Sequence, residues 1–164
     1  MKVSKNYLDN TSFSNIKETL LSPYFPWYYN EGVVKINDGQ SQLVHTFFDK
    51  DNGYINSNYF QIIQPILNKF KIFTLLRIKA NLTLKTDNHV EYGFHNDYSK
   101  NDNCKITTAI FYVNTNNGYT IIEDKKVVSK ENTFVEFDST LKHSGFSSTD
   151  SLKRLVINFN YIKL

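Results

Sequence analysis

The strongest constraint on the fold is a strict alternation of apolar and polar residues between Leu75 and Lys85. Leu76, Ile78, Ala80, Leu82 and Leu84 alternate with Arg77, Lys79, Asn81, Thr83 and Lys85. Because successive side chains of a strand point to opposite faces, this pattern predicts one strand with an aliphatic face and a polar face. The aliphatic face is expected to pack under a helix, and the polar face either lines a cavity or meets solvent.

Several shorter segments have the same strand character and are separated by turn residues. They lie near Val33–Ile36, Gln42–Phe48, Val90–Tyr98, Lys105–Asn114, Tyr119–Glu123, Thr133–Asp138 and Lys153–Ile162. Short strands at such spacing are typical of an antiparallel sandwich or barrel. Two helices are expected in the N-terminal part of the chain, with the first two of these strands between them. Ser14 is expected to cap one that runs to about Leu21, and Ser57 to Phe70 carries an apolar stripe at helical spacing that Pro65 kinks or restarts.

The length of 164 residues suits one domain, 1–164, in which residues 1–71 support a β-rich core formed by 72–164. The formal net charge of +3 is spread along the chain, without the runs of like charge that mark a nucleic-acid arm or a membrane-binding patch. No segment approaches the ~20 apolar residues of a membrane span. The single cysteine, Cys104, fits a reducing compartment, so we expect a soluble, cytoplasmic protein.

Three residues distant in sequence suggest a metal site. His95 and Asp97 lie two positions apart in a predicted strand, so their side chains project to the same face. His143 follows His95 by 48 positions (143 − 95), enough for several strands before the chain returns. Two histidines and one carboxylate leave about three coordination positions open, as non-haem iron requires, whereas zinc prefers a fuller nitrogen or sulfur shell. His45 reads instead as a packed or edge-strand histidine.

An arginine and two polar side chains are candidates for binding an anion near that metal. Arg154 opens the last predicted strand, 11 positions after His143 (154 − 143). If it points inward with Val156, Asn158 and Asn160, it needs an anion, and a carboxylate matches its planar guanidinium. The alternative is a surface arginine at a strand start. Tyr112 could offer its hydroxyl to the same anion or be a core tyrosine, and Asn81 faces either the cavity or solvent.

Taken together, these residues resemble the 2-oxoglutarate and iron(II)-dependent dioxygenases, in particular prolyl-4-hydroxylase-like members and compact versions from marine bacteriophages. The segments that carry the resemblance are Phe25–Tyr29, Arg77–Leu82, Gly93–Tyr98, Thr107–Gly118, Lys142–Gly145 and Arg154–Tyr161. The resemblance implies a mainly β fold, a double-stranded β-helix (a cupin-like jelly roll) with N-terminal helices packed on one sheet.

The resemblance also implies roles for individual residues. His95, Asp97 and His143 look like the iron ligands, and Arg154 like the partner of the distal carboxylate of 2-oxoglutarate. Tyr112 matches a tyrosine on that carboxylate, and Asn81 is a looser match to a co-substrate contact. Asn160 departs from the pattern, because some prolyl hydroxylases have an aromatic residue there. For this reason their substrate preference is not transferred to this chain.

The function implied is an oxidoreductase that couples oxidative decarboxylation of 2-oxoglutarate to hydroxylation of a C–H bond, with a prolyl residue as one candidate. Fe(II), 2-oxoglutarate and dioxygen are the implied cofactor and co-substrates, and ascorbate is a further candidate. The expected partner is a peptide or a small molecule, with the host-cell cytoplasm as the location for a phage-encoded enzyme. Arg77, Tyr98 and Trp27 are candidates for the substrate side. Two alternatives stay open: a nucleic-acid-modifying oxygenase of the same family, which no basic-aromatic stripe supports, and a metal-binding jelly roll without turnover.

Overall fold

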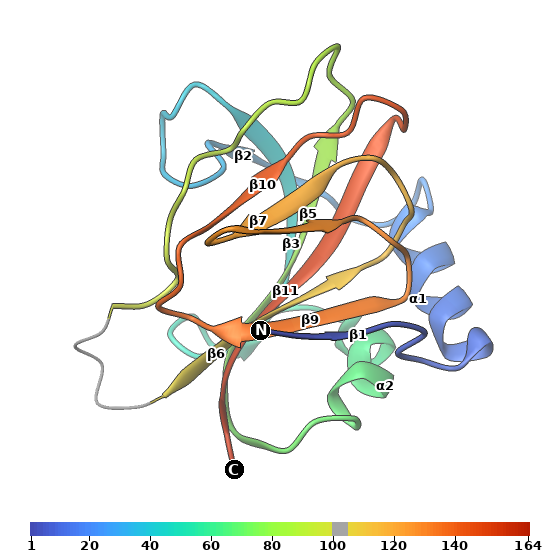
Figure 1. Cartoon of the computed structure of the whole chain (residues 1–164). Coiled ribbons are helices and arrows are strands. Elements are labelled where there is room, and N and C mark those ends of the chain that lie inside the picture. The colour runs from blue at the N-terminus through green and yellow to red at the C-terminus, as the bar shows by residue number, and fades with distance from the viewer. Residues whose placement is uncertain (100–104) are drawn as a thin grey trace.

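The chain forms two antiparallel sheets with helices on the outer face of the larger one (Figure 1). This arrangement comes from a computed structural model that describes residues 1–99 and 105–164, so Cys104 lies outside the described residues. In the larger sheet the order is β1 (Lys2–Ser4), β9 (Thr133–Asp138), β6 (Ile106–Tyr112), β11 (Lys153–Lys163), β5 (Ile72–Leu84), β3 (Ser41–Asp49) and β2 (Tyr28–Glu31), and β4 (Tyr54–Ile55) pairs with β3. The smaller sheet has the order β10 (His143–Phe146), β7 (Tyr119–Ile122) and β8 (Lys125–Val128).

The alternating segment forms the long strand β5, as its pattern predicts. It pairs with β3 on one side and with β11 on the other. Its apolar residues, such as Ile78 and Ala80, are fully buried, while Lys79 and Asn81 face a cavity on the opposite side. β11 has the same polarity: Leu155, Ile157, Phe159 and Tyr161 join the core beneath the helices. The sheet therefore has one face for packing and one for a site.

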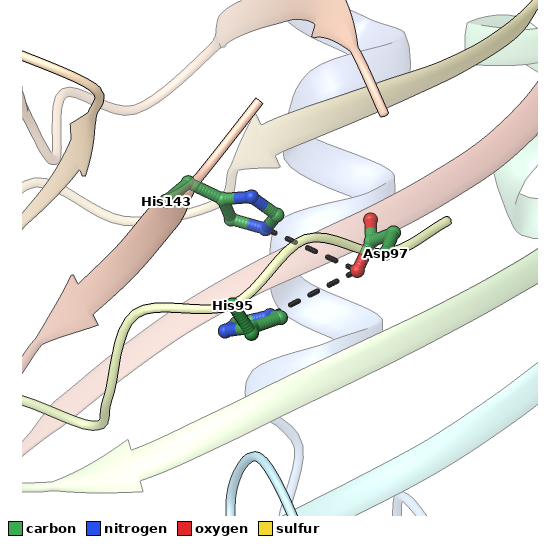
Figure 2. A group of neighbouring side chains, drawn as sticks. All are labelled: His95, Asp97 and His143. Carbon is green, nitrogen blue, oxygen red and sulfur yellow. Dashed lines mark ion pairs between the residues drawn. The ribbon is translucent and has the colours of Figure 1, made fainter. Parts of the chain in front are cut away.

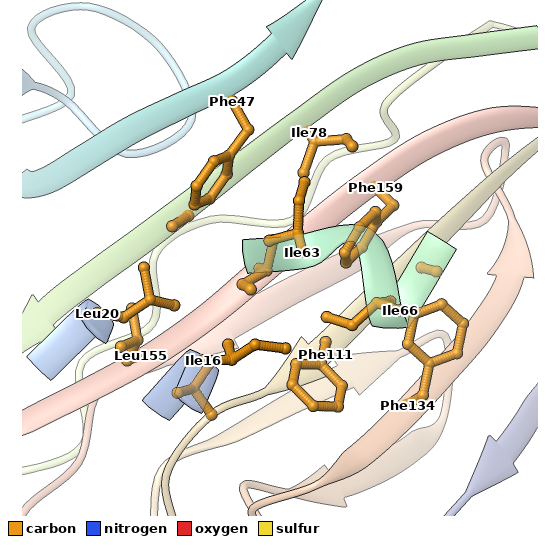
Figure 3. Packing of buried hydrophobic residues seen from close by; sticks show 14 of the residues in the cluster. Ile16, Leu20, Phe47, Ile63, Ile66, Ile78, Phe111, Phe134, Leu155 and Phe159 are labelled. Carbon is orange, nitrogen blue, oxygen red and sulfur yellow. The ribbon is translucent and has the colours of Figure 1, made fainter. Parts of the chain in front are cut away.

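The core beneath the helices is built from α1 (Asn10–Leu21), the 3-10 helix η1 (Phe60–Ile63) and α2 (Gln64–Leu67) (Figure 3). Ile16 and Leu20 of α1 and Ile63 and Ile66 of the shorter helices are fully buried against the sheet. Burial of a side chain of this size stabilises the fold by roughly 1.5–3 kcal/mol. These contacts hold the large sheet in place behind the cavity.

Both helices differ from the sequence prediction at their ends. The first begins earlier, because Asp9 rather than Ser14 caps it: the Asp9 carboxylate accepts a hydrogen bond from the backbone N–H of Ser12 at 2.9 Å. The helix predicted from Ser57 to Phe70 is limited to residues 60–67, and Pro65 lies in the first turn of α2, where a missing N–H costs little.

A second core fills the space between the sheets. Ile110, Val135, Phe137 and Val156 of the large sheet pack against Ile122 of the small one. The mainly β jelly-roll fold with helices on one sheet is thus confirmed. Among the described residues, no helix has the length and apolar character needed to cross a bilayer.

Two strand predictions were wrong. Val33–Ile36 is a turn, because the Asp38 carboxylate accepts hydrogen bonds from the N–H groups of Val33, Val34 and Lys35 and so competes with strand pairing. Val90–Tyr98 is an irregular segment whose pairing within residues 1–99 and 105–164 consists of two isolated bridges, Glu91 with Phe146 and His95 with His143. Five short strands, β1, β2, β4, β8 and β10, were not predicted, because their pairing depends on distant partners.

Candidate metal centre

The three predicted metal ligands lie together at one end of the cavity. His95 comes from the segment after β5, Asp97 from the same segment, and His143 from the start of β10. Both imidazole Nε2 atoms point at the same Asp97 oxygen, Oδ1, at 3.8 Å from His95 and 3.9 Å from His143 (Figure 2). The ligand atoms of all three residues lie within 4.8 Å of one another. This spacing lets one cation contact all three.

Backbone pairing, not a regular strand, aligns the two histidines. The N–H of His95 donates to the carbonyl of His143 at 3.0 Å, and the N–H of His143 donates to the carbonyl of His95 at 2.8 Å. Asp97 is fixed separately, by its N–H to the carbonyl of Ser139 at 3.1 Å. Gly93 precedes this segment with a φ of 96°, a conformation that favours glycine. The irregular segment is therefore held to the metal end by tertiary hydrogen bonds.

Each histidine is oriented by its second ring nitrogen. His95 Nδ1 lies 3.1 Å from the carbonyl oxygen of Gly93, and His143 Nδ1 lies 3.1 Å from that of Leu141. A carbonyl only accepts, so both Nδ1 atoms carry the proton and both Nε2 atoms keep their lone pair. Burial also lowers the pKa of His143, against the opposing effect of Asp97. The hydrogen bonds select the tautomer whose Nε2 lone pair faces Asp97, and burial favours the neutral imidazole of His143 that a metal requires.

Asp97 is held by its other oxygen. Oδ2 accepts hydrogen bonds from Thr108 Oγ1 at 2.6 Å and from Asn160 Nδ2 at 2.8 Å, which leaves Oδ1 turned to the histidines. Burial raises the pKa of Asp97, but His143, these two hydrogen bonds and Arg77 together outweigh it, so the pKa lies below its usual value. Asn160 is fully buried, and its Oδ1 accepts from Arg77 Nε at 3.2 Å. Asn160 thus supports the carboxylate.

The cavity extends from this cluster to Arg154 and has a volume of about 310 Å³. Arg154 is 5% exposed, points inward, and donates to Ser129 Oγ at 3.0 Å and Thr120 Oγ1 at 3.0 Å. No carboxylate in the described part of the chain lies within ion-pair distance of it. Burial lowers the pKa of Arg154, against the effect of Tyr112 and Tyr92. A buried guanidinium of this kind is suited to binding an anion that enters the cavity.

The other two predicted co-substrate residues differ in position. Asn81 lines the cavity and is 8% exposed. Tyr112 is fully buried beside Arg154 rather than in the cavity wall, and its hydroxyl donates to Thr120 Oγ1 at 2.8 Å. Thr120 accepts from both Tyr112 and Arg154, so its own proton is left to donate into the cavity.

Sequence reasoning missed Thr120 and Thr83. Thr83 pairs with Arg154 across β5 and β11, lines the cavity, and has a buried Oγ1 without a hydrogen-bond partner in the described structure. The alternation of β5 put Thr83 on the polar face, which was the available signal. No sequence signal pointed to Thr120, because its position depends on how the small sheet packs.

The three residues proposed for the substrate side are separated in the structure. Arg77 lines the cavity, with Nη2 3.9 Å from Asp97 Oδ1. Tyr98 is half-buried near Arg77. Trp27 packs instead on the core with Phe25, at 5.1 Å between ring centroids, and is not part of the cavity lining.

Comparison with known proteins places the fold. No family model and no curated protein sequence matches this chain. Solved structures do. An oxidoreductase of the 2OG-Fe(II) oxygenase family from Burkholderia pseudomallei matches with a TM-score of 0.67 at 13% identity, over 97% of this chain and 82% of that one. A Trichoplax adhaerens prolyl hydroxylase in complex with a hypoxia inducible factor peptide gives 0.68 at 13% identity, over 99% and 83%.

A viral collagen prolyl hydroxylase from Paramecium Bursaria Chlorella virus-1 gives a TM-score of 0.63 at 12% identity, over 99% of this chain and 95% of that one. At such identities the likeness shows the fold alone. The function depends instead on the side chains of the site.

Proposed function

We propose that this chain is an Fe(II)- and 2-oxoglutarate-dependent dioxygenase that hydroxylates a C–H bond of its primary substrate. The observation that carries the proposal is a single cavity with a His-Asp-His cluster at one end and a buried arginine at the other. Among the described residues, no carboxylate pairs with this arginine. A dicarboxylic acid that spans the cavity would bind a metal at the cluster with one end and the Arg154 guanidinium with the other. The resemblance in fold to oxygenases and prolyl hydroxylases supports this assignment.

The donor set fits iron better than a structural zinc. Two imidazole nitrogens and one carboxylate oxygen leave several positions open, while a structural zinc site is closed by four protein ligands. His95 Nε2, Asp97 Oδ1 and His143 Nε2 would hold the metal. When bound, iron and 2-oxoglutarate supply an oxidant for a C–H bond through the reduction of dioxygen, with release of succinate and carbon dioxide.

The protein's part at the other end is to bind and orient the co-substrate. Arg154 would hold the distal carboxylate of 2-oxoglutarate, and the hydroxyls of Thr120 and Thr83 would donate to the same group. Tyr112 would act through Thr120, whose oxygen it fixes, and Asn81 would contact the middle of the molecule. Buried Ile110 and Val156 line the cavity and exclude water.

The primary substrate is a peptide or a small molecule, and a prolyl residue remains one candidate. A prolyl hydroxylase of similar fold was solved in complex with a peptide, and this supports a peptide as one candidate substrate of the present chain. Dioxygen is the second co-substrate, and ascorbate is a candidate for maintaining the metal in the reduced state. A compact bacteriophage type stays a prediction from the sequence.

The test is release of succinate from 2-oxoglutarate by purified protein, with and without Fe(II). We expect release that requires the metal and falls to background in Asp97→Ala, because the cluster loses its carboxylate. Asp124→Ala, an exposed aspartate in the turn before β8, is the matched control and should keep full release. Succinate release that persists in Asp97→Ala would contradict the assignment. No release from protein shown to bind the metal would favour the jelly roll without turnover.

A further inference from the structure

Three cationic side chains line the cavity against a single carboxylate. Arg77, Lys79 and Arg154 stand opposite Asp97 among the described lining residues. On the proposed function, a divalent metal and the dianion of 2-oxoglutarate cancel each other. The loaded cavity would then keep two more positive than negative charges. A buried excess of this kind is costly unless a further anion binds.

Arg77 lies on the side of the metal cluster away from Arg154. In the pairing of β5 with β11, Arg77 is opposite Asn160, which supports Asp97, whereas Arg154 is opposite Thr83, six positions further along β5 (83 − 77). The co-substrate would span from the metal to Arg154, so it extends away from Arg77. Arg77 thus faces the space left for the molecule that is oxidised.

Among the described residues, the ion pair that Arg77 forms is a weak one. Its Nη2 is 3.9 Å from Asp97 Oδ1, the oxygen that a metal would take, and its side chain is 37% exposed. Asp49 lies opposite Arg77 on β3, and Arg77 helps to lower its pKa, but the two form no ion pair, and the Asp49 carboxylate accepts hydrogen bonds within its own turn, from the Asp51 N–H and from Asn52 Nδ2. Metal binding would therefore leave the guanidinium facing a dication, with no other carboxylate of the described residues within ion-pair distance.

Lys79 lies two residues inward on the same face of β5 and lines the cavity. In the portion of the chain that the structure describes, its ammonium group has no hydrogen bond or ion pair. Burial lowers the pKa of Lys79 to about 8, with Arg77 adding to the effect. Asn158, paired with Lys79 on β11, has a buried Oδ1 that lacks a donor. An anion would pair with the Lys79 ammonium group, and an N–H group next to that anion would donate to Asn158 Oδ1.

We infer that the primary substrate is a small carboxylic acid whose carboxylate is held by Arg77 and Lys79. This inference rests on the proposed function and names the substrate class of the same site. A small acid fits better than a polymer, because Lys79 lies mostly buried within a cavity of about 310 Å³, while a chain lying across the mouth would meet only Arg77. Arg77 offers a planar fork that matches a carboxylate, and Lys79 a point charge.

The test uses protein loaded with Mn(II) and 2-oxoglutarate, in which no turnover occurs. Two pairs of probes are added, acetate with acetamide and L-proline with L-prolinamide, and the paramagnetic relaxation of the probe protons reports binding near the metal. We expect the carboxylate of at least one pair to be favoured by about tenfold or more over its amide. Arg77→Gln and Lys79→Met should each remove most of this preference, and Arg77→Lys should restore part of it.

Lys85→Met is the matched control, because Lys85 is exposed just beyond β5 and should not affect the preference. Equal relaxation by acid and amide in both pairs would overturn the inference, as would a preference that survives in both variants, since the acid then binds the metal directly. Weakened 2-oxoglutarate binding in Lys79→Met would assign that lysine to the co-substrate and overturn its role here. Failure of the wild-type protein to bind Mn(II) or 2-oxoglutarate would instead refute the proposed function, on which the inference rests.

Discussion

Replacement of Asn160 by leucine should weaken metal binding without touching a ligand. Asn160 is fully buried, and its amide donates to Asp97 Oδ2 at 2.8 Å and to Thr108 Oγ1 at 3.1 Å. Leucine has a similar volume but no donor. Of its two hydrogen bonds in the described structure, Asp97 Oδ2 would keep the one from Thr108, and Arg77 Nε would lose its acceptor.

The size of the effect follows from these contacts. A hydrogen bond to a charged group contributes roughly 1.5–3 kcal/mol. Loss of an outer partner of a metal ligand costs roughly 10–100-fold in metal affinity, which corresponds to about 1.4–2.8 kcal/mol. The two ranges agree, so Asn160→Leu should raise the Kd for Mn(II) by about 10–100-fold. The free energy of unfolding should also fall by about 1–3 kcal/mol, because a buried carboxylate oxygen loses one hydrogen-bond donor.

Electron paramagnetic resonance of free Mn(II) measures the Kd, and urea unfolding of the metal-free protein measures the stability. Asn158→Leu is the matched control: it lies on the same face of β11, and its Oδ1 has no hydrogen-bond partner in the described structure. We expect it to bind Mn(II) as the wild type does. A Kd for Mn(II) that is the same in Asn160→Leu as in Asn158→Leu would refute the role assigned to Asn160.

Three further predictions concern other parts of the structure. Gly118→Ala should weaken 2-oxoglutarate binding about tenfold or more and leave Mn(II) binding unchanged, because the added Cβ would lie 2.6 Å from Arg154 Cδ and displace that side chain; equal co-substrate Kd values by calorimetry would contradict this. Lys79→Met should stabilise the metal-free protein by about 1–3 kcal/mol at about pH 7 in urea unfolding, since it removes a buried charge. The gain should shrink as the pH rises from about 8 toward 10.5, where the folded wild type has already lost the proton and the unfolded chain still holds it. Burial lowers the pKa of His45 below 6.5, so the unfolded chain binds more protons and stability is lost as the pH falls below that value; the thermal midpoint of His45→Gln should change less between about pH 7 and about pH 5, and an unchanged slope would count against this.

The long strands could be predicted because their environment is written in their own residues. The alternation of β5 and the polarity of β11 both follow from one face against the helices and one against the cavity. The same reasoning grouped Arg154 with Val156, Asn158 and Asn160 on one face of the last strand, but left open whether that face points inward or to the surface. Periodicity was informative where both faces of a strand have fixed partners.

The segment around His95 could not be predicted correctly, because distant residues determine it. Alternation suggested a strand, yet the backbone forms isolated bridges at Glu91, with Phe146, and at His95, with His143, while the Asp97 N–H donates separately to the carbonyl of Ser139. Two ligands two positions apart still converge, but through these tertiary hydrogen bonds. Val33–Ile36 failed for a local reason, since the Asp38 carboxylate binds the N–H groups that a strand would use. Thr120 was missed because it comes to the site only through the packing of the smaller sheet.

The most direct test of the central claim is a crystal structure of the protein soaked anaerobically with Fe(II) and 2-oxoglutarate. We expect a cation bound by His95 Nε2, Asp97 Oδ1 and His143 Nε2, and a co-substrate whose distal carboxylate contacts Arg154. A cation bound elsewhere, or a guanidinium of Arg154 that no carboxylate reaches at saturating 2-oxoglutarate, would contradict the account.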